Sequence, residues 1–299
     1  MDVDVAVIGG SFAGLAATLQ LVRARRRILL VDAGNPRNRM AETMHGMPGQ
    51  DGKSPAAVRA DMFEEVQGYP GLTVVRGEAV AAAPAEGGFV ITLADGGLVQ
   101  AAKVILATGV IDDLPPVPGL AERWGTSVFH CPYCHGFEVA GRRIAVLGTL
   151  PESLIQALML PDWSEHVTLL PDGRVPLTDE ARKQLAKRGV ATEDTPVTAI
   201  EGAGTTVEAL RLADGRSLDA DVVYTLSTTR PASPLAGQLG CSTEAGPFGP
   251  VVTTDEWCQT NIPGVYAAGD TARIFQTATL ALADGVTAAV GAHHAMVLG

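Results

Sequence analysis

The stretch VIGGSFAG, residues 7–14, decides the first fold prediction because of what stands on either side of it. The run DVAVIGG, which overlaps it, predicts a buried strand, and LAATLQLVRA, residues 15–24, predicts a helix. A second strand, RILLVDAG, follows and contains the acidic residue Asp32 near its end. A strand, a glycine turn, a helix and an acid in this order are the fingerprint of a dinucleotide-binding unit.

Each residue type in this turn has a physical role. Gly9 permits the tight turn, and Gly14 lets the helix and the strand approach closely. The free N–H groups of a helix N-terminus hold a pyrophosphate, and Asp32 is placed to accept hydrogen bonds from a ribose. Ser11 stands where the pattern usually has its second glycine. The predicted cofactor contacts of this unit are Gly9, Gly10, Ser11, Phe12, Ala13, Gly14, Asp32 and Ala33.

A second unit of the same kind occupies the middle of the chain. The stretch GRRIAVLGTLPES, residues 141–153, predicts another strand, turn and helix, and a strand at HVTLLPDG follows. The prolines of LPPVPG, residues 114–119, indicate a linker before this unit. The last part of the chain, with the strand NIPGVYAAGD and an apolar helix, resembles the first unit again. The prediction is therefore an α/β protein with two Rossmann-like domains, one discontinuous (1–112 and 231–299) and one inserted (113–230).

Composition excludes several classes of partner. The chain of 299 residues has 33 acidic and 22 basic residues and a net charge of −11, which argues against nucleic acid and an anionic membrane surface. The apolar tail at 277–298 contains Asp284 and His293, so it predicts a packed helix rather than a membrane span. No basic segment precedes the first strand, and we expect no signal peptide and a cytoplasmic protein.

The stretch FHCPYCHGFE, residues 129–138, admits two interpretations. Cys131 and Cys134 are two residues apart and are flanked by His130 and His135, four potential ligands of a zinc ion. The same CxxC spacing is the signature of a redox-active dithiol. Four cysteines in the whole chain are too few for a disulfide scaffold, so a catalytic or metal-binding role is expected.

A closed zinc site normally takes its four ligands from two separated pairs. The other cysteines, Cys241 and Cys258, form no second CxxC, and the two histidines are chain neighbours of the first pair. We therefore predict no metal, and we expect Cys241 and Cys258 to be inert packing residues.

Together these motifs resemble the low-molecular-weight thioredoxin reductase family of flavoproteins. The resemblance rests on VIGGSFAG, VILATG (residues 104–109), the CxxC and GVYAAGD (residues 264–270), and it covers nearly the whole chain. It implies FAD in the first, discontinuous domain, an inserted NADPH-like domain that carries the dithiol, and a homodimer. Further cofactor contacts are expected in two segments and one loop, at Ala107, Thr108, Gly109, Gly269, Asp270, Gln276, Thr277 and His45.

The resemblance also assigns roles around the dithiol. In the family the second cysteine, here Cys134, faces the flavin, and the first, here Cys131, exchanges with the substrate. Thioredoxin reductases carry an aspartate directly after the second cysteine, whereas this chain has His135, which resembles the branch of FAD-dependent dithiol oxidases that act on gliotoxin- or holomycin-type natural products. The predicted catalytic residues are Cys131, Cys134, His135 as the acid–base group, and His130. A structural role for His135, capping the helix expected to start there, is the alternative.

The second dinucleotide unit departs from its expected pattern. Only the first glycine of G-x-G-x-x-G is present, at Gly148, and Leu150 puts a bulky side chain where the main chain must approach a pyrophosphate. Pro151 lacks an N–H, Glu152 adds negative charge, and Arg174 stands alone where the family has several arginines. NADPH binding is therefore doubtful, although an unusual phosphate site is an open alternative.

These observations predict an FAD-dependent dithiol oxidase that forms a disulfide in a small or protein dithiol and reduces dioxygen to hydrogen peroxide. Alternatives are an NADPH- or ferredoxin-dependent disulfide reductase and a flavin-bearing redox sensor with little turnover. The sequence does not identify the dithiol substrate, because substrate-facing loops have no readable code.

Overall fold

The computed structural model describes residues 2–299, which divide into two compact units. The first unit comprises Met1–Arg39, Pro55–Ile111 and Thr229–Gly299, and the second comprises Met40–Ser54 and Asp112–Thr228. The predicted fold class, α/β with two Rossmann-like domains, is confirmed. One difference from the predicted boundaries is the segment Met40–Ser54, which belongs with the second unit and brings His45 there.

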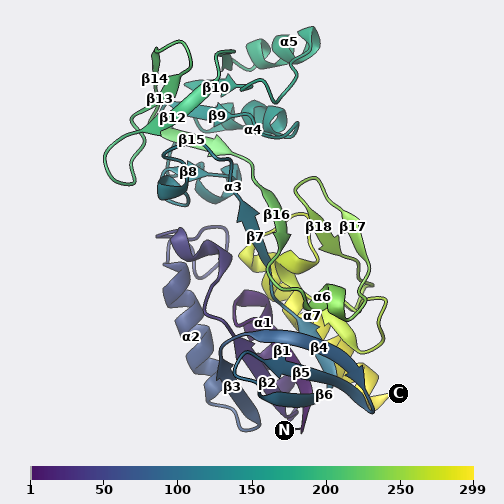
Figure 1. Cartoon of the computed structure of the whole chain (residues 1–299). Coiled ribbons are helices and arrows are strands. Elements are labelled where there is room, and N and C mark those ends of the chain that lie inside the picture. The colour runs from purple at the N-terminus through teal and green to yellow at the C-terminus, as the bar shows by residue number, and fades with distance from the viewer. Residues whose placement is uncertain (1) are drawn as a thin grey trace. The chain divides into compact units, whose positions relative to one another are not determined.

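The first unit is built on a seven-stranded sheet in the order β3-β2-β1-β6-β5-β4, with β19 paired to the second half of β6 (Figure 1). β1 is parallel to both β2 and β6, whereas β5 is antiparallel to β6 and to β4. The strands are β1 (Asp2–Ile8), β2 (Ile28–Asp32), β3 (Leu72–Arg76), β4 (Ala79–Ala85), β5 (Gly88–Leu93), β6 (Leu98–Leu106) and β19 (Val265–Ala267).

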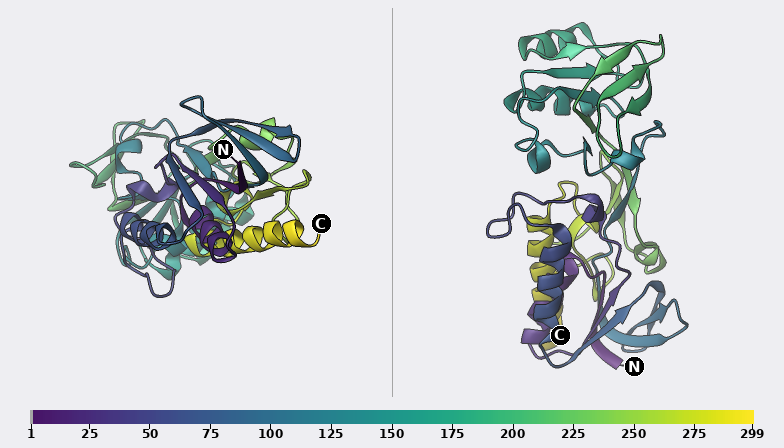
Figure 2. Two further views of the ribbon diagram at one scale, coloured as in Figure 1. Left: turned by 90° about the horizontal axis from the view of Figure 1, so that it is seen from below. Right: turned by 90° about the vertical axis from the view of Figure 1, so that its left-hand side faces the viewer.

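Helices cover the central strands of this sheet, because β2 and β19 are buried on both faces and β1 is buried on both faces over its second half. α1 and α7 lie side by side (Figures 1 and 2), and a core cluster on the strands includes residues of the short helix α6. The remaining elements of the unit are α1 (Phe12–Arg23), η1 (Arg37–Met40), α2 (Pro55–Gln67), α6 (Leu235–Gln238), β17 (Thr243–Ala245), β18 (Pro250–Val252), the 3-10 turn η4 (Gly269–Thr271) and α7 (Ala278–Val297). No helix among residues 2–299 is long and apolar enough to cross a membrane.

The second unit has a parallel sheet in the order β11-β10-β9-β15-β8 and an antiparallel sheet, β12-β13-β14. Alternate residues of β9 point to opposite faces, so Ile144 and Val146 join a cluster with residues of α4 and α5, while Ala145 and Leu147 join one with the antiparallel sheet. The elements are η2 (Ala121–Arg123), β8 (Val128–Phe129), α3 (Pro132–His135), β9 (Ile144–Leu147), α4 (Ser153–Met159), η3 (Leu160–Asp162), β10 (Val167–Leu170), α5 (Asp179–Lys187), β11 (Ala191–Thr192), β12 (Val197–Glu201), β13 (Ala209–Leu212), β14 (Ser217–Asp219) and β15 (Val222–Thr225).

The prediction that the prolines of residues 114–119 form a linker is wrong. The chain passes between the units at β7 (Val110–Asp113) and returns at β16 (Thr228–Pro231), and these two strands pair. The proline segment packs inside the second unit, where Val117 is buried and the Pro118 carbonyl accepts a hydrogen bond from the Ile200 N–H. Proline restricts the backbone, which fits a packed turn as well as a linker.

Arg123 holds this segment in place. Its side chain is almost fully buried, and its guanidinium donates to the carbonyl oxygens of Thr206 at 2.7 Å, Gly119 at 2.9 Å and Gly202 at 2.5 Å. We predict that Arg123→Ala lowers the free energy of unfolding of the second unit by about 3 kcal/mol, because three carbonyls lose a charged donor. Urea unfolding followed by tryptophan fluorescence measures this, since Trp124 and Trp163 both lie in that unit.

The matched control for this prediction is Arg182→Ala. Arg182 makes an exposed ion pair with Asp194 at 2.9 Å, and loss of such a pair costs about 0–1 kcal/mol. Equal effects of the two substitutions would contradict the structural role of Arg123.

Candidate functional site

The turn between β1 and α1 has the features of an anion site. α1 begins at Phe12, and the preceding Ser11 makes no side-chain capping bond, so the first N–H groups of this twelve-residue helix have no cap. Uncapped N–H groups at a helix N-terminus, together with the helix dipole, favour a phosphate. The residues predicted from sequence therefore fit the pyrophosphate of a dinucleotide.

Two glycines, which have no side chain, allow close main-chain contacts between α1, the turn and the end of β6. A β-carbon built at Gly14 would lie 1.7 Å from the Gly9 carbonyl oxygen, and one built at Gly9 would lie 2.1 Å from the Ala107 carbonyl oxygen. Gly9 also has φ +114°, which disfavours any other residue. The turn thus abuts the end of β6, where Ala107, Thr108 and Gly109 were predicted as cofactor contacts.

Asp32 has partners that sequence reasoning missed. Its carboxylate is 5% exposed and accepts hydrogen bonds from Arg59 and, at 2.6 Å, from Arg76. Arg59 also donates to the Gly10 carbonyl at 2.7 Å, so it ties the glycine turn to the end of β2. The Gly34 N–H donates to the other carboxylate oxygen at 3.1 Å. A ribose hydroxyl at Asp32 would therefore share the carboxylate with these donors.

Asp284 on α7 organises the last segment of this site. Its buried carboxylate accepts hydrogen bonds from the Gly269 N–H at 3.2 Å and from Arg273 at 2.5 Å. Beside it, the Thr271 hydroxyl accepts from the Gly109 N–H at 2.7 Å, so the two predicted segments of the cofactor site are joined. Asp284 lies in the largely apolar helix α7, and no sequence motif around it predicts its contacts with Gly269 and Arg273.

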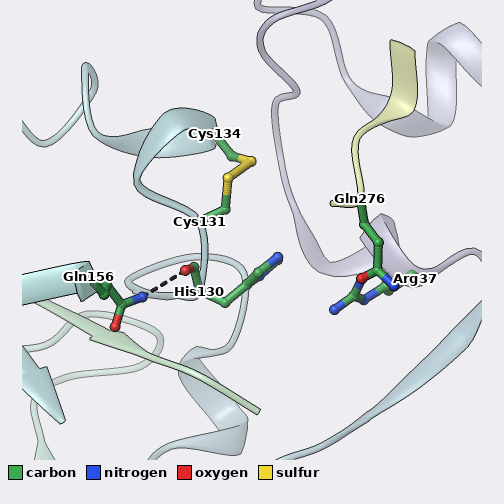
Figure 3. Close-up of a disulfide and its surroundings, with 6 residues drawn as sticks. All are labelled: Arg37, His130, Cys131, Cys134, Gln156 and Gln276. Carbon is green, nitrogen blue, oxygen red and sulfur yellow. Dashed lines mark hydrogen bonds between the residues drawn. A yellow bond between two sulfur atoms is a disulfide. The ribbon is translucent and has the colours of Figure 1, made fainter. Parts of the chain in front are cut away.

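The other predicted residues of this segment contact one another. Asp270 pairs with Arg37 at 3.1 Å, and the Gln276 carbonyl oxygen accepts from the same guanidinium, with the two side chains close together in Figure 3. The Thr277 hydroxyl accepts from the Leu280 N–H at 3.1 Å and caps α7. Ala33 is exposed.

The matching turn of the second unit is closed by its own side chains. The buried Ser153 hydroxyl accepts hydrogen bonds from the Thr149 N–H at 3.2 Å and the Leu150 N–H at 3.3 Å. The Gly148 N–H donates to the Leu170 carbonyl, just as the Gly9 N–H donates to the Val31 carbonyl in the first unit, whereas Pro151 has no N–H to offer. Arg174 pairs with Asp172 at 3.3 Å within its own loop. Two main-chain donors of this turn, Thr149 and Leu150, are thus engaged by a side chain of the same turn.

The dithiol lies at the start of the one-turn helix α3. Cys131 is the N-cap residue, and its sulfur forms a disulfide with that of Cys134 (Figure 3). The two sulfurs bond each other in this oxidised state, and the prediction that the pair binds no zinc ion stays a prediction. His135 is the last residue of α3 rather than the first residue of a helix, so the suggested capping role is wrong.

The two histidines that flank the dithiol have different surroundings. The ring of His130 stacks on Trp124 with centroids 5.7 Å apart, and its carbonyl accepts from the Gln156 amide at 2.7 Å (Figure 3). The ring of His135 stacks on Phe129 at 4.4 Å and meets the ring of His45 edge-on at 6.1 Å.

His45, His135 and Glu138 form a cluster of ionisable groups. One donor atom from each lies within 4.8 Å of the others, and His45 Nε2 is 3.4 Å from Glu138 Oε1. Among residues 2–299 this is the only such group of three, and because imidazoles and a carboxylate at this spacing can exchange protons, we call it the acid–base cluster. His45 therefore lies with the dithiol in the second unit, and its predicted contact with the cofactor stays a prediction.

The pKa values in the dithiol unit follow from burial. Burial lowers the pKa of His135, a proton held on His45 lowers it further, and the Glu138 carboxylate partly offsets both. His135 is therefore a neutral base at neutral pH. Elsewhere, burial raises the pKa of Cys258 to about 11 and also raises that of Cys241, which fits inert thiols.

A family model for the pyridine nucleotide-disulphide oxidoreductases matches residues 3–285. The chain belongs to this family. It is an oxidoreductase of a family that binds flavin, and the predicted resemblance to thioredoxin reductase-like proteins is confirmed.

Relatives of this oxidoreductase cover nearly its whole length. It is 33% identical to the thioredoxin reductase sirT of Leptosphaeria maculans over 96% of this chain and 92% of that protein. Among solved structures, an oxidoreductase from Agrobacterium tumefaciens is 42% identical with a TM-score of 0.95 and covers 100% of this chain and 99% of its own. The structure of HlmI is 35% identical with a TM-score of 0.92 and covers 99% of this chain and 93% of its own.

The close approach at Gly14 gives a testable prediction for flavin binding. Gly14→Ala adds a β-carbon that overlaps the Gly9 carbonyl, so we expect a loss of about 1–3 kcal/mol of stability or more and protein purified with little flavin. The ratio of flavin to protein absorbance and the melting temperature measure both effects. Gly237→Ala in α6, where a β-carbon meets no atom within 4 Å, should leave both unchanged.

The titration of His135 gives a second prediction. In 15N-histidine NMR of the oxidised protein, its midpoint should lie below the ordinary value of 6.5. Glu138→Gln removes the charge that raises the pKa and should lower the midpoint further, whereas His45→Ala should raise it. A midpoint at or above 6.5 in the unaltered protein would contradict the described surroundings.

Proposed function

We propose that this flavoprotein is a dithiol oxidase, which closes a disulfide in a dithiol substrate and does not depend on NADPH. The observation that carries the proposal is the hydroxyl of Ser153, which accepts hydrogen bonds from the N–H groups of Thr149 and Leu150. These N–H groups occupy the place where the second Rossmann unit would bind a pyrophosphate. Without that site, a dithiol becomes the natural electron donor.

The reaction begins with thiol–disulfide exchange at the cysteine pair. One substrate thiol loses its proton to His135 and attacks the Cys131 sulfur, and Cys134 leaves as a thiolate. The second substrate thiol then attacks the mixed disulfide and releases Cys131, so the product leaves with a new disulfide. Two electrons have passed from the substrate sulfurs to the protein pair.

Bound FAD would supply the two-electron acceptor that returns the pair to a disulfide, with dioxygen as the final acceptor and hydrogen peroxide as the product. The residues proposed to hold it are those of the turn before α1, the end of β6 and the η4 turn, with Asp32 at the ribose. Within this site Arg59 and Asp284 fix the main-chain segments that would contact the cofactor.

The relatives support the broader class to which the proposal belongs, the thioredoxin reductase-like disulfide oxidoreductases. HlmI and sirT of Leptosphaeria maculans are similar to this chain along nearly their whole length, and sirT carries the name thioredoxin reductase. That name favours a second candidate function, an NADPH-dependent reduction of a protein disulfide through the same cysteine pair. We also expect a homodimer in the cytoplasm, and sedimentation of the purified protein tests the first of these expectations.

Anaerobic titration of the flavin-loaded protein distinguishes the two functions. We predict that one equivalent of NADPH leaves the visible flavin absorbance unchanged, and that dithiothreitol bleaches it. Cys134→Ser should abolish bleaching by dithiothreitol because the exchange has no leaving thiolate. Stoichiometric bleaching by NADPH would establish the reductase instead and refute the proposed oxidase.

A further inference from the structure

The acid–base cluster beside the dithiol extends to the surface through His45. Its Nε2 lies 3.4 Å from Glu138 Oε1, and its Nδ1 lies 3.6 Å from Asp51 Oδ1. Asp51 is itself held by the Gly46 N–H at 2.9 Å. The exposed fraction of the side chains rises along this series, from 15% for His45 to 37% for Glu138 and 64% for Asp51. The His45 imidazole therefore lies between the carboxylates of Glu138 and Asp51, both of which are exposed to solvent.

Burial lowers the pKa of His135, whose ring stacks on the buried Phe129, so a proton on this imidazole is disfavoured. A neutral His45 can accept that proton, whereas a His45 that already holds one disfavours the imidazolium further. Yet each exchange releases one proton: R(SH)2 and the Cys131–Cys134 disulfide give R(S–S), a Cys131 thiol, a Cys134 thiolate and H+. His135 must lose the first thiol's proton before it accepts one from the second.

We propose that His45 and Glu138 relay the thiol proton from His135 to solvent, so that the second half of the exchange can proceed. This inference rests on the proposed function of the cysteine pair. The donor atoms of the three residues lie within 4.8 Å of one another, a span that a direct contact or one water molecule bridges. His45 and Glu138 act through His135 and are positioning residues rather than catalytic ones.

The other ionisable groups around this cluster do not compete for the proton. Burial and the nearby Glu138 carboxylate raise the pKa of Tyr224, so this phenol is neutral throughout the working range. Asp51 has a lowered pKa because the Gly46 N–H and His45 stabilise its carboxylate, so it is charged and able to attract a proton towards solvent. Cys131 and Cys134 carry no proton in the disulfide with which the exchange begins, and the proposed scheme keeps Cys134 as a thiolate after the first attack.

The test follows reduction of the cysteine pair directly. The FAD-loaded protein is mixed anaerobically with excess dithiothreitol, quenched with acid, alkylated and analysed by mass spectrometry. In His45→Ala we expect the fully reduced pair to appear at least about 10-fold more slowly, with a dithiothreitol adduct on Cys131 accumulating. Added imidazole should restore the rate. Glu138→Gln should behave alike, and Glu122→Gln, an exposed carboxylate elsewhere in the unit, should match the unaltered protein.

The exchange rate of the His45→Ala variant distinguishes two roles for His45, a proton relay and a charge that only shifts the pKa of His135. As a neighbour only, His45 lowers the basicity of His135, so its removal would leave the exchange as fast or faster, without an adduct. That result would overturn the relay and leave the oxidase proposal intact. Conversely, rapid reduction of the pair without bleaching of the flavin would count against the oxidase, while slowed, imidazole-rescued exchange in His45→Ala would still support the relay.

Discussion

A contact between main-chain atoms of α1 and the end of β1 sets the geometry of the first unit. Because Gly14 has no side chain, the helix begins directly at the turn, and its first N–H groups face the place of a phosphate. A second close main-chain contact of this kind occurs at Gly285 of α7, where a β-carbon would lie 2.1 Å from the Ala13 carbonyl oxygen. The neighbouring Asp284 can then reach the Gly269 N–H and fix the third segment of the site.

The second unit keeps the architecture of the first but differs from it at the turn between its first strand and helix. Its parallel sheet and helices keep the Rossmann arrangement, since their cores depend only on apolar residues at alternate positions. A single hydroxyl, that of Ser153, takes the N–H groups that a nucleotide would need. The fold of this unit does not by itself imply a bound nucleotide, because packing stabilises the sheet whether or not the turn binds an anion.

Burial shapes the chemistry around the dithiol. An exposed histidine would titrate near neutral pH, whereas His135 is pressed against Phe129 and is neutral there. A neutral imidazole can accept a thiol proton. The negative charge of Glu138 raises the pKa of His135 and so stabilises the imidazolium that forms. His130, at the other side of the pair, stacks on Trp124 and lies outside this cluster. Two histidines that look alike in the sequence thus receive different environments.

The sequence by itself determined the features that depend on neighbours along the chain: the glycine turn with its strand and helix, the CxxC pair, and the departures at Leu150 and Pro151. Only the tertiary structure decided the partners that arrive from distant segments, such as Arg59 at Asp32, Asp284 at Gly269, and His45 beside His135. Local patterns record backbone conformation and burial. They carry no record of which long polar side chain meets a group brought near by folding, because that pairing depends on the packing of whole elements.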